Sequence, residues 1–275
     1  MYLSAERLAI ADREVMETFA QTSIAWQAIP NWDTGDPGAA RVRNDIVDNP
    51  SFFPVELQQD QWQATLAQLG APTPDSLLAE VMATSAKLAA KVDYNVICTL
   101  RTQVTLATQK VGIGVLNGPN IMNALIDARA KVEDAGYRAP SCLLTNTEGL
   151  KALNAFTAGN YPVADLILNA ANINSLHRTS RFDTVAPDDD VPPAAVPAVP
   201  KDKVVMILLG RRQRIAQGGA ADASPGEEPV DLAVSVFPSL ELIGENNLRD
   251  IEMAARIRYA TRVKDQLGVV LLTSP

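Results

Sequence analysis

The sequence predicts a mixed α+β fold built around one long helix and one long strand. Between residues 251 and 263 the large apolar residues fall on odd positions and the charged residues on even ones, which indicates a strand with one buried and one solvent-facing side. Such a strand measures about 43 Å at about 3.3 Å per residue. Residues 75–100 repeat apolar side chains at steps of three and four, the pattern of a helix about 39 Å long. Residues 119–210 mix shorter helix and strand signals, so we expect a compact α/β region beside the two long elements.

The amino-terminal part of the chain divides into a helix and an extended segment. A helix is expected from Ser4, which can cap it, to Ile29, and the prolines and glycines of residues 30–38 end it. We therefore assign residues 1–37 to an N-terminal helix and arm. Residues 38–72 have no stable period and predict an extended loop or an irregular hairpin.

The long helix carries a start signal of its own. Thr73 is the expected cap, Pro74 the first helical residue, and Asp75 favours the positive end of the helix dipole. Residues 73–118 then form one unit, consisting of this helix and the connection that follows it.

The middle region, residues 119–210, alternates helices and strands. The expected elements are a helix from Pro119 to Gly136, a strand over 141–145, a helix capped by the box Thr145 and Glu148, a helix after Pro162 and a central strand over 203–210. Five prolines lie between Pro187 and Pro200, and they predict an exposed loop over residues 183–201.

Residues 211–275 form a carboxy-terminal group of strands. A strand over 230–236 is expected to stop at Pro238. The long strand 251–263 follows it, and the apolar run 268–273 closes the chain.

Composition excludes several classes of protein. The net charge of -8 disfavours wrapping around nucleic acid, which needs a surplus of Lys and Arg on some face. Cys98 and Cys142 both sit in apolar runs and predict two buried thiols rather than a disulfide. The first residues do not have the pattern of a signal peptide, and no apolar run is long enough to span a membrane. We expect assembly in the cytoplasm of a bacterium, or a place in a virion if the chain is phage-encoded.

Motifs that carry chemistry are missing from the sequence. The single histidine, His177, has no motif around it, and we interpret it as a surface or loop histidine. The glycines between Gly112 and Gly118 are spaced GxGxxxG rather than GxGxxG, which indicates a connection ending at an Asn117 cap. The acidic run 188–190 fits no calcium loop and is typical of a solvated charge run. The sequence therefore predicts no catalytic, cofactor-binding or metal-binding residues.

The long strand carries a row of arginines on its even positions. Arg256, Arg258 and Arg262 could contact phosphate, but such a row more often pairs with carboxylates on a neighbouring strand or subunit. We expect the second arrangement.

Three segments together carry a resemblance to a known family. They are residues 78–100, residues 121–155 and residues 231–272, of which the first contains the acidic–aromatic pair Asp93 and Tyr94. In order and pattern they resemble the HK97-type fold that tailed-phage major capsid proteins share with encapsulin shell proteins. Residues 38–72 do not clearly show the two-stranded extended arm with which this family clasps neighbouring subunits.

The resemblance implies a long spine helix, extended peripheral strands and a compact α/β axial domain. It also implies self-assembly into an icosahedral shell that encloses cargo protein or double-stranded DNA, with no cofactor. Under it, the subunit-interface candidates are Arg256, Arg258, Arg262, Ile257 and Tyr259, and the candidates at a symmetry axis are Asp188, Asp189, Asp190, Pro192 and Pro193. An elongated chain buries its apolar stripe only in part, and adjacent copies cover the remainder.

Two alternatives stay open at the level of sequence. One is an α/β enzyme that binds a nucleotide at Gly112–Gly118, with Glu133 or Asp134 near a ribose. The other is a scaffold protein that forms no icosahedral shell.

Overall fold

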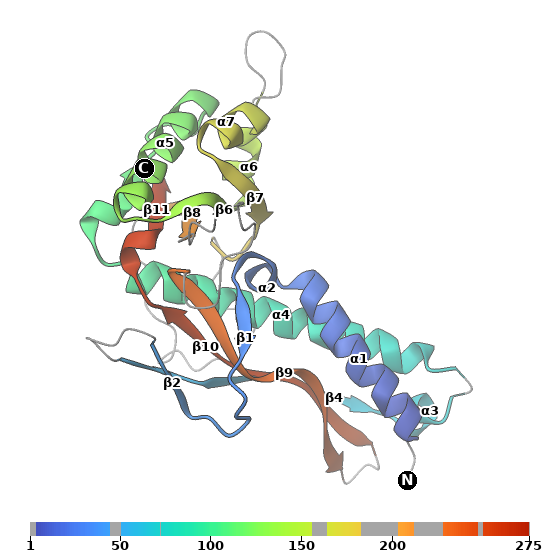
Figure 1. Cartoon of the computed structure of the whole chain (residues 1–275). Helices are drawn as coiled ribbons and strands as arrows, with labels where there is room; N and C mark the ends of the chain where they lie inside the picture. The colour runs from blue at the N-terminus through green and yellow to red at the C-terminus, as the bar shows by residue number, and fades with distance from the viewer. Residues whose placement is uncertain are drawn as a thin grey trace, which may run out of the picture.

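The computed structural model describes residues 4–44, 51–71, 73–155, 164–182, 203–211, 228–246 and 250–274. They form two lobes, each with a β-sheet and helices, which lie one above the other (Figure 1). The lower one, the spine lobe, comprises residues 5–44, 51–71, 73–103, 230–246 and 250–263. The upper one, the compact lobe, comprises residues 107–155, 164–182, 203–211 and 266–274. The chain therefore leaves the spine lobe, builds the compact lobe, returns for two long strands and ends in the compact lobe.

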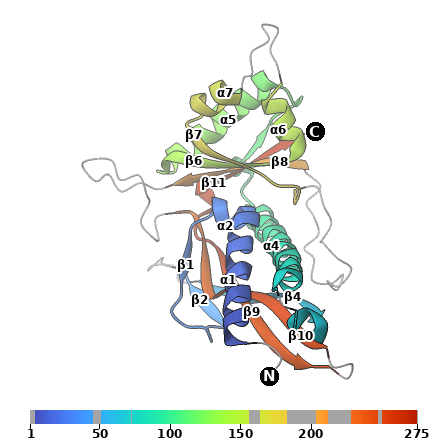
Figure 2. The same cartoon turned by 90° about the vertical axis from the view of Figure 1, so that its right-hand side faces the viewer.

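The spine lobe contains a four-stranded sheet in the order β1–β9–β10–β4. Its strands are β1 (Asn31–Asp33), β4 (Glu56–Ala64), β9 (Val230–Glu245) and β10 (Ile251–Val263). Its helices are α1 (Ala5–Thr22), α2 (Ile24–Ala28), α3 (Leu66–Leu69) and α4 (Asp75–Gln103). The long helices lie on one face of the sheet, and a short hairpin of β2 (Arg41–Arg43) and β3 (Phe52–Pro54) lies on the other (Figures 1 and 2).

Helix α4 is the long helix that the sequence predicts. It has 29 residues and measures about 43 Å. The predicted cap is wrong, however, because Pro74 itself occupies the N-cap position and no side chain caps the helix there. The apolar side of α4 is buried against α1 and the sheet, and this contact forms the main core of the lobe.

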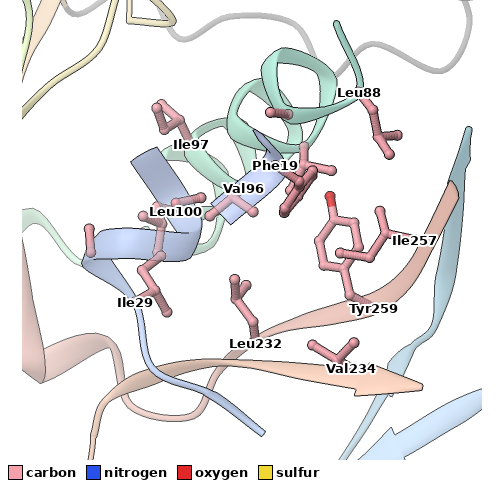
Figure 3. Packing of buried hydrophobic residues seen from close by; sticks show 14 of the residues in the cluster. Phe19, Ile29, Leu88, Val96, Ile97, Leu100, Leu232, Val234, Ile257 and Tyr259 are labelled. Carbon is pink, nitrogen blue, oxygen red and sulfur yellow. The ribbon is translucent and has the colours of Figure 1, made fainter. Parts of the chain in front are cut away.

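The strand predicted over 251–263 is confirmed as β10. Its odd residues Ile257 and Tyr259 point toward α4 and are fully buried beside Leu88 and Phe19 (Figure 3). The even side was expected to face solvent, and here the prediction is wrong. Ala254, Ala260 and Arg262 are buried, and the other even residues are half-buried. The reason is that the chain between Pro37 and Arg43 covers part of this side of the sheet.

Strand β9 does not stop at Pro238 as the sequence predicts but continues to Glu245. The register explains this difference. Arg256 lies opposite Ser239 and Arg258 opposite Val236, so β9 places two residues where β10 has one. Such a β-bulge tolerates proline, because the extra residue makes no ladder hydrogen bond.

The predicted helix over 4–29 is split at Ser23 into α1 and α2. Ser4 caps α1 as expected, accepting from the Arg7 amide. The cause of the split is Asp93 of α4. Its carboxylate accepts hydrogen bonds from the Ser23 hydroxyl at 2.7 Å and from the amides of Ile24 and Ala25 at 3.0 and 2.8 Å. Burial raises the pKa of Asp93, although these hydrogen bonds act in the opposite direction.

The compact lobe contains a five-stranded sheet in the order β5–β11–β8–β6–β7. Its strands are β5 (Lys110–Gly112), β6 (Arg138–Thr145), β7 (Ile173–Arg178), β8 (Lys203–Arg211) and β11 (Val269–Ser274). Helices α5 (Gly118–Asp134), α6 (Thr147–Leu153) and α7 (Ala164–Ala170) cover the face turned away from the spine lobe (Figures 1 and 2). Two single 3₁₀ turns, η1 (Ala107–Gln109) and η2 (Gln266–Gly268), flank β5 and β11.

The central strand β8 is buried on both faces, as its unbroken apolar run predicts. Val205 and Leu208 pack with the helices of the compact lobe, whereas Ile207 and Leu209 belong to the core that continues into the spine lobe. The two lobes therefore share a hydrophobic core across this sheet. The buried thiols Cys98 and Cys142 are free, as predicted.

Three features of the compact lobe differ from the sequence-based expectation. The cap of α6 is Asn146, which accepts from the Gly149 amide, and not Thr145. Strand β7 was not predicted, and His177, interpreted from the sequence as a surface or loop histidine, lies within it. The closing strand β11 joins this sheet rather than the long strands that precede it in residues 211–275.

The segment 38–72 contains both an irregular hairpin and an unexpected strand. The hairpin is β2–β3, whereas β4 pairs along β10 from Glu56 to Ala64. Among the residues described, no helix combines the length and apolar character needed to cross a membrane.

We expect Asp93→Ala to lower the free energy of unfolding by about 3 kcal/mol, because it leaves three hydrogen-bond donors inside the core without their acceptor. Chemical denaturation measures this change. Asp75→Ala, at the exposed start of α4, is the matched control and should cost no more than about 1 kcal/mol. Equal effects of the two substitutions would contradict the role assigned to Asp93.

We expect Ile257→Asp to prevent folding of the single chain, because it places a carboxylate among the buried apolar side chains beneath α4. Leu242→Asp on β9 serves as the control, since Leu242 is exposed and its substitution should change stability by less than about 0.5 kcal/mol. Circular dichroism and solubility separate the two variants. A folded, soluble Ile257→Asp chain would show that this position is not in the core.

Candidate assembly surface

The three arginines on the even side of β10 make two kinds of contact: one forms a partly exposed ion pair, and the other two hold backbone carbonyls of a distant segment. Arg256 forms an ion pair with Glu241 of β9 at 2.6 Å, and both side chains are about one-third exposed. Arg258 donates to the backbone carbonyls of Pro37 and Ala39 at 2.9 and 3.3 Å. The row therefore pairs in part with a carboxylate on the neighbouring strand, as the sequence predicts.

Arg262 forms the most buried charged contact of the spine lobe. Its Nε and Nη2 donate to the two carboxylate oxygens of Asp231 at 2.6 and 2.5 Å. The side chains of Arg262 and Asp231 are only 1% and 3% exposed. Lys264 adds a second cation, with its Nζ 3.0 Å from Asp231. The guanidinium carbon of Arg262 also lies 4.6 Å from the ring centre of Trp32.

The third nitrogen of Arg262 reaches the arm, which we define as residues 31–44 and 51–54. Its Nη1 donates to the carbonyl of Arg43 at 2.8 Å. Together with the bonds from Arg258 to Pro37 and Ala39, this contact fixes the backbone of the arm across the even side of β10. The arginines therefore position the arm rather than face solvent as a row.

The arm presents an exposed aromatic residue beyond these anchors. Phe52 of β3 is 55% exposed, and the Arg41 guanidinium stacks over its ring at 4.8 Å. Leu57, at the start of β4, is exposed as well. The far end of the β9–β10 ribbon exposes Leu242 and Ile243, at 49% and 45%.

Exposed apolar side chains are spread over both lobes rather than gathered in one cleft. The large ones among the described residues are Met16, Phe52, Leu57, Met82, Leu106, Val115, Ile126, Leu166, Leu242, Ile243 and Leu267. A monomer exposes single apolar residues as a matter of course, but contiguous apolar surface marks contact with other molecules.

The chain matches no known family model and no curated protein. Solved structures, by contrast, match it over almost its whole length. A virus-like particle from Pyrococcus furiosus aligns with a TM-score of 0.69 and 14% identity, over 98% of each chain. A protein of Mycobacterium phage Cain aligns with a TM-score of 0.60 and 13% identity, over 93% of this chain and 91% of the other. The capsid of cyanophage P-SCSP1u aligns with a TM-score of 0.55 and 9% identity, over 90% of this chain and 86% of the other.

The chain has the HK97-type capsid and encapsulin fold. The resemblance drawn from the sequence is confirmed at the level of fold, which includes the long helix, the mixed sheets and the α+β class. At identities of 9–14% these matches concern the fold alone.

Within the HK97-type fold, the predicted interface residues have unequal positions. Arg256 is partly exposed and available to a neighbour, and Arg258 and Arg262 hold the arm. Ile257 and Tyr259 lie inside the chain's own core, so any effect of these two on contacts between copies is indirect. Burial also raises the pKa of the Tyr259 hydroxyl far above its ordinary value.

The symmetry-axis candidates lie outside the described residues. They are Asp188, Asp189, Asp190, Pro192 and Pro193, within the proline-rich stretch 183–201. Their role at an axis remains a prediction.

The glycine-rich turn connects β5 to α5 in a way that disfavours a dinucleotide site. Asn117 caps α5 by accepting from the Asn120 amide at 2.9 Å, as the sequence predicts. Glu133 and Asp134 lie at the carboxyl end of α5, about 23 Å along the helix from Gly118. A carboxylate that far from the turn cannot bind a ribose whose phosphates sit at the turn.

Titratable groups do not converge on a reactive centre. His177 lies half-buried on β7, and burial lowers its pKa. Within the described parts of the chain, no three His, Cys, Asp or Glu side chains come together as metal ligands would.

Sequence reasoning missed the residues that complete the Arg262 contact. Asp231 alternates with the apolar residues Val230 and Leu232, a pattern typical of a strand with one solvent-facing side, and Trp32 lies in no recognisable motif. One signal could have indicated the buried ion pair. Asp231 is the single charged residue near the start of an otherwise apolar strand, and the strand that follows it is rich in arginine.

We expect Asp231→Ala to destabilise the chain by about 3–5 kcal/mol, because it leaves the Arg262 guanidinium buried without its counter-ion. Thermal and urea denaturation measure the loss. Glu241→Ala breaks the more exposed pair with Arg256 and is the matched control, with an expected cost below about 1 kcal/mol. A loss below 1 kcal/mol for Asp231→Ala would refute the assigned role.

Proposed function

We propose that this chain is a structural subunit that assembles with copies of itself into a closed protein shell. The observation that carries the proposal is the alignment with the virus-like particle from Pyrococcus furiosus, which spans 98% of both chains with a TM-score of 0.69. The alignment includes both lobes and leaves only a small part of either chain unmatched. A subunit that reproduces the whole architecture of a shell-forming chain is a strong candidate to form a shell itself.

The distribution of apolar surface supports the same proposal. Leu242 and Ile243 lie near the end of the β9–β10 ribbon, Phe52 lies on β3 of the arm, and Val115 precedes α5. These sites lie on different sides of the molecule, which suits contact with several neighbours at once. An obligate assembly buries such residues as the core of its interfaces.

The proposed role is one of assembly and not of catalysis. Among the described residues the few candidate groups for chemistry are scattered, from His177 on β7 to the glycine turn before α5. The proposed activity depends instead on the shape of the subunit and on its perimeter.

The shell content we propose is cargo protein, with packaged double-stranded DNA as the second candidate. The virus-like particle gives a TM-score of 0.69, whereas the phage proteins named above give 0.60 and 0.55. Those phage matches are the observation that favours the second candidate. Assembly of a cargo-containing shell would take place in the bacterial cytoplasm, and a DNA-containing shell would become a virion.

The decisive experiment is to purify the protein and measure its mass in solution. We expect particles on the order of megadaltons by light scattering, where a monomer has 29.5 kDa, and closed hollow shells in negative-stain images. A monomer or dimer that persists at high concentration would refute the proposal. Nuclease treatment, the ratio of absorbance at about 260 to about 280 nm and mass spectrometry of the particles then distinguish DNA from protein content.

A further inference from the structure

Arg101, near the end of α4, is a buried cation without a counter-ion among the described residues. The buried arginines in this part of the chain are Arg101, Arg129 and Arg262, with side chains 6%, 5% and 1% exposed. Arg129 and Arg262 each form an ion pair with a carboxylate. Arg101 instead donates from Nη1 to the backbone carbonyl of Phe182 at 3.1 Å. Because a buried charge without a partner is strongly destabilising, we expect an anion to accompany Arg101.

Two further polar groups lie beside Arg101 on the same face of α4. Tyr94, Cys98 and Arg101 are spaced four and three residues apart, which lines them up along the helix. Tyr94 and Cys98 are 4% and 8% exposed, so the cluster lies close beneath the surface. The Nε of Arg101 has no hydrogen-bond acceptor in the described part of the chain. The hydroxyl of Tyr94 likewise lacks one, and only the thiol of Cys98 lies beside it.

The cluster offers hydrogen-bond donors at neutral pH. Burial raises the pKa of Tyr94 to about 12 and raises the pKa of Cys98 as well, while the nearby charge of Arg101 acts in the opposite direction on both. The hydroxyl and the thiol therefore keep their protons, and the guanidinium is always charged. Such a set matches a ligand that only accepts hydrogen bonds.

The acidic side chains around this part of α4 are engaged elsewhere. Asp93 accepts its three hydrogen bonds at the junction of α1 and α2. Asp60 of β4 pairs with Lys91 at 2.6 Å. Glu56, at the start of β4, is exposed and lies opposite Tyr259 in the sheet. None of these three carboxylates forms an ion pair with Arg101.

A second cation lies near the cluster. Arg181 directly precedes Phe182, whose carbonyl accepts from Arg101, and it is half-buried. It has no ion-pair partner within the described ranges, and its positive charge acts on Asp93 of α4. Two neighbouring cations favour a doubly charged anion over a single carboxylate.

We propose that the cluster of Tyr94, Cys98 and Arg101 binds a small, doubly charged oxyanion of the phosphate type. The guanidinium supplies a charge-assisted hydrogen bond, the hydroxyl a second donor and the thiol a weak third. The bound anion lies where α4 of the spine lobe meets the turn after β7 of the compact lobe, and it strengthens that junction. This site is independent of the proposed shell function.

The first test measures binding of inorganic phosphate to the purified full chain by isothermal titration calorimetry, at constant ionic strength with chloride as the reference. We expect saturable binding, and Arg101→Gln should raise the dissociation constant at least about tenfold, because it removes the charged donor. Tyr94→Phe keeps the ring and should weaken binding about fivefold. Arg129→Gln is the matched control, since it also removes a buried arginine, and it should bind phosphate as the wild type does.

Cys98 supplies an independent readout. Bound phosphate should slow its alkylation by iodoacetamide at least about threefold in the wild type and in Arg129→Gln, but not in Arg101→Gln. Mass spectrometry of the peptides measures the rate, with Cys142 on β6 as the internal reference. Thermal unfolding without phosphate verifies that each variant folds. Phosphate also stabilises proteins in general, so the difference between the two arginine variants is the criterion.

Absence of phosphate binding to the wild type overturns the inference, as does binding that persists unchanged in Arg101→Gln and Tyr94→Phe. Binding that appears only after Asp188→Asn, Asp189→Asn and Asp190→Asn also overturns it, because carboxylates of the chain itself then occupy the site. These three aspartates lie outside the described residues. Every measurement applies whether or not the chain forms particles, so its outcome is separate from that of the proposed function.

Discussion

The buried contact between Arg262 and Asp231 constrains the rest of the spine lobe. These residues are opposite one another in the β9–β10 ladder, so the ion pair forms only in the observed register. A slip of one strand by one residue would turn its charged side chain to the other face of the sheet, and both charges would lose their partner, one of them in the apolar core beneath α4. The same guanidinium holds the arm through the Arg43 carbonyl and stacks on Trp32. One side chain therefore couples the pairing of the long strands to the position of the arm.

The lobes are joined by a shared core as well as by the chain. The sheet of the compact lobe has one face under α5–α7 and the other toward α4 and the long strands. Only residues 264–268 separate β10 from β11, and the Tyr137 hydroxyl donates to Asp265 there at 2.6 Å. The long strands and the compact lobe are therefore joined by a short and hydrogen-bonded connection.

Local patterns predicted the long elements well and the tertiary contacts poorly. Helix α4 and strand β10 follow from periodicity within their own residues, which the surroundings do not change. The burial of Arg262 depends on Trp32 and Arg43, which are more than two hundred residues away in sequence, so no local signal could reveal it. The cap at Asn146 differs from the predicted Thr145 by one position, and both residue types can cap. Strand β4 is polar along much of its length, and only its pairing with β10 makes it a strand.

The carboxylate of Asp93 links the folding of this chain to proton uptake. Its pKa in the folded chain lies above the ordinary value of 3.8, so the folded state binds more protons than the unfolded state between these two values. As the medium is acidified through that interval, this group favours the native chain increasingly, in contrast to an aspartate held by a salt bridge. Protonation of Asp93 therefore favours the junction of α1, α2 and α4 rather than opening it.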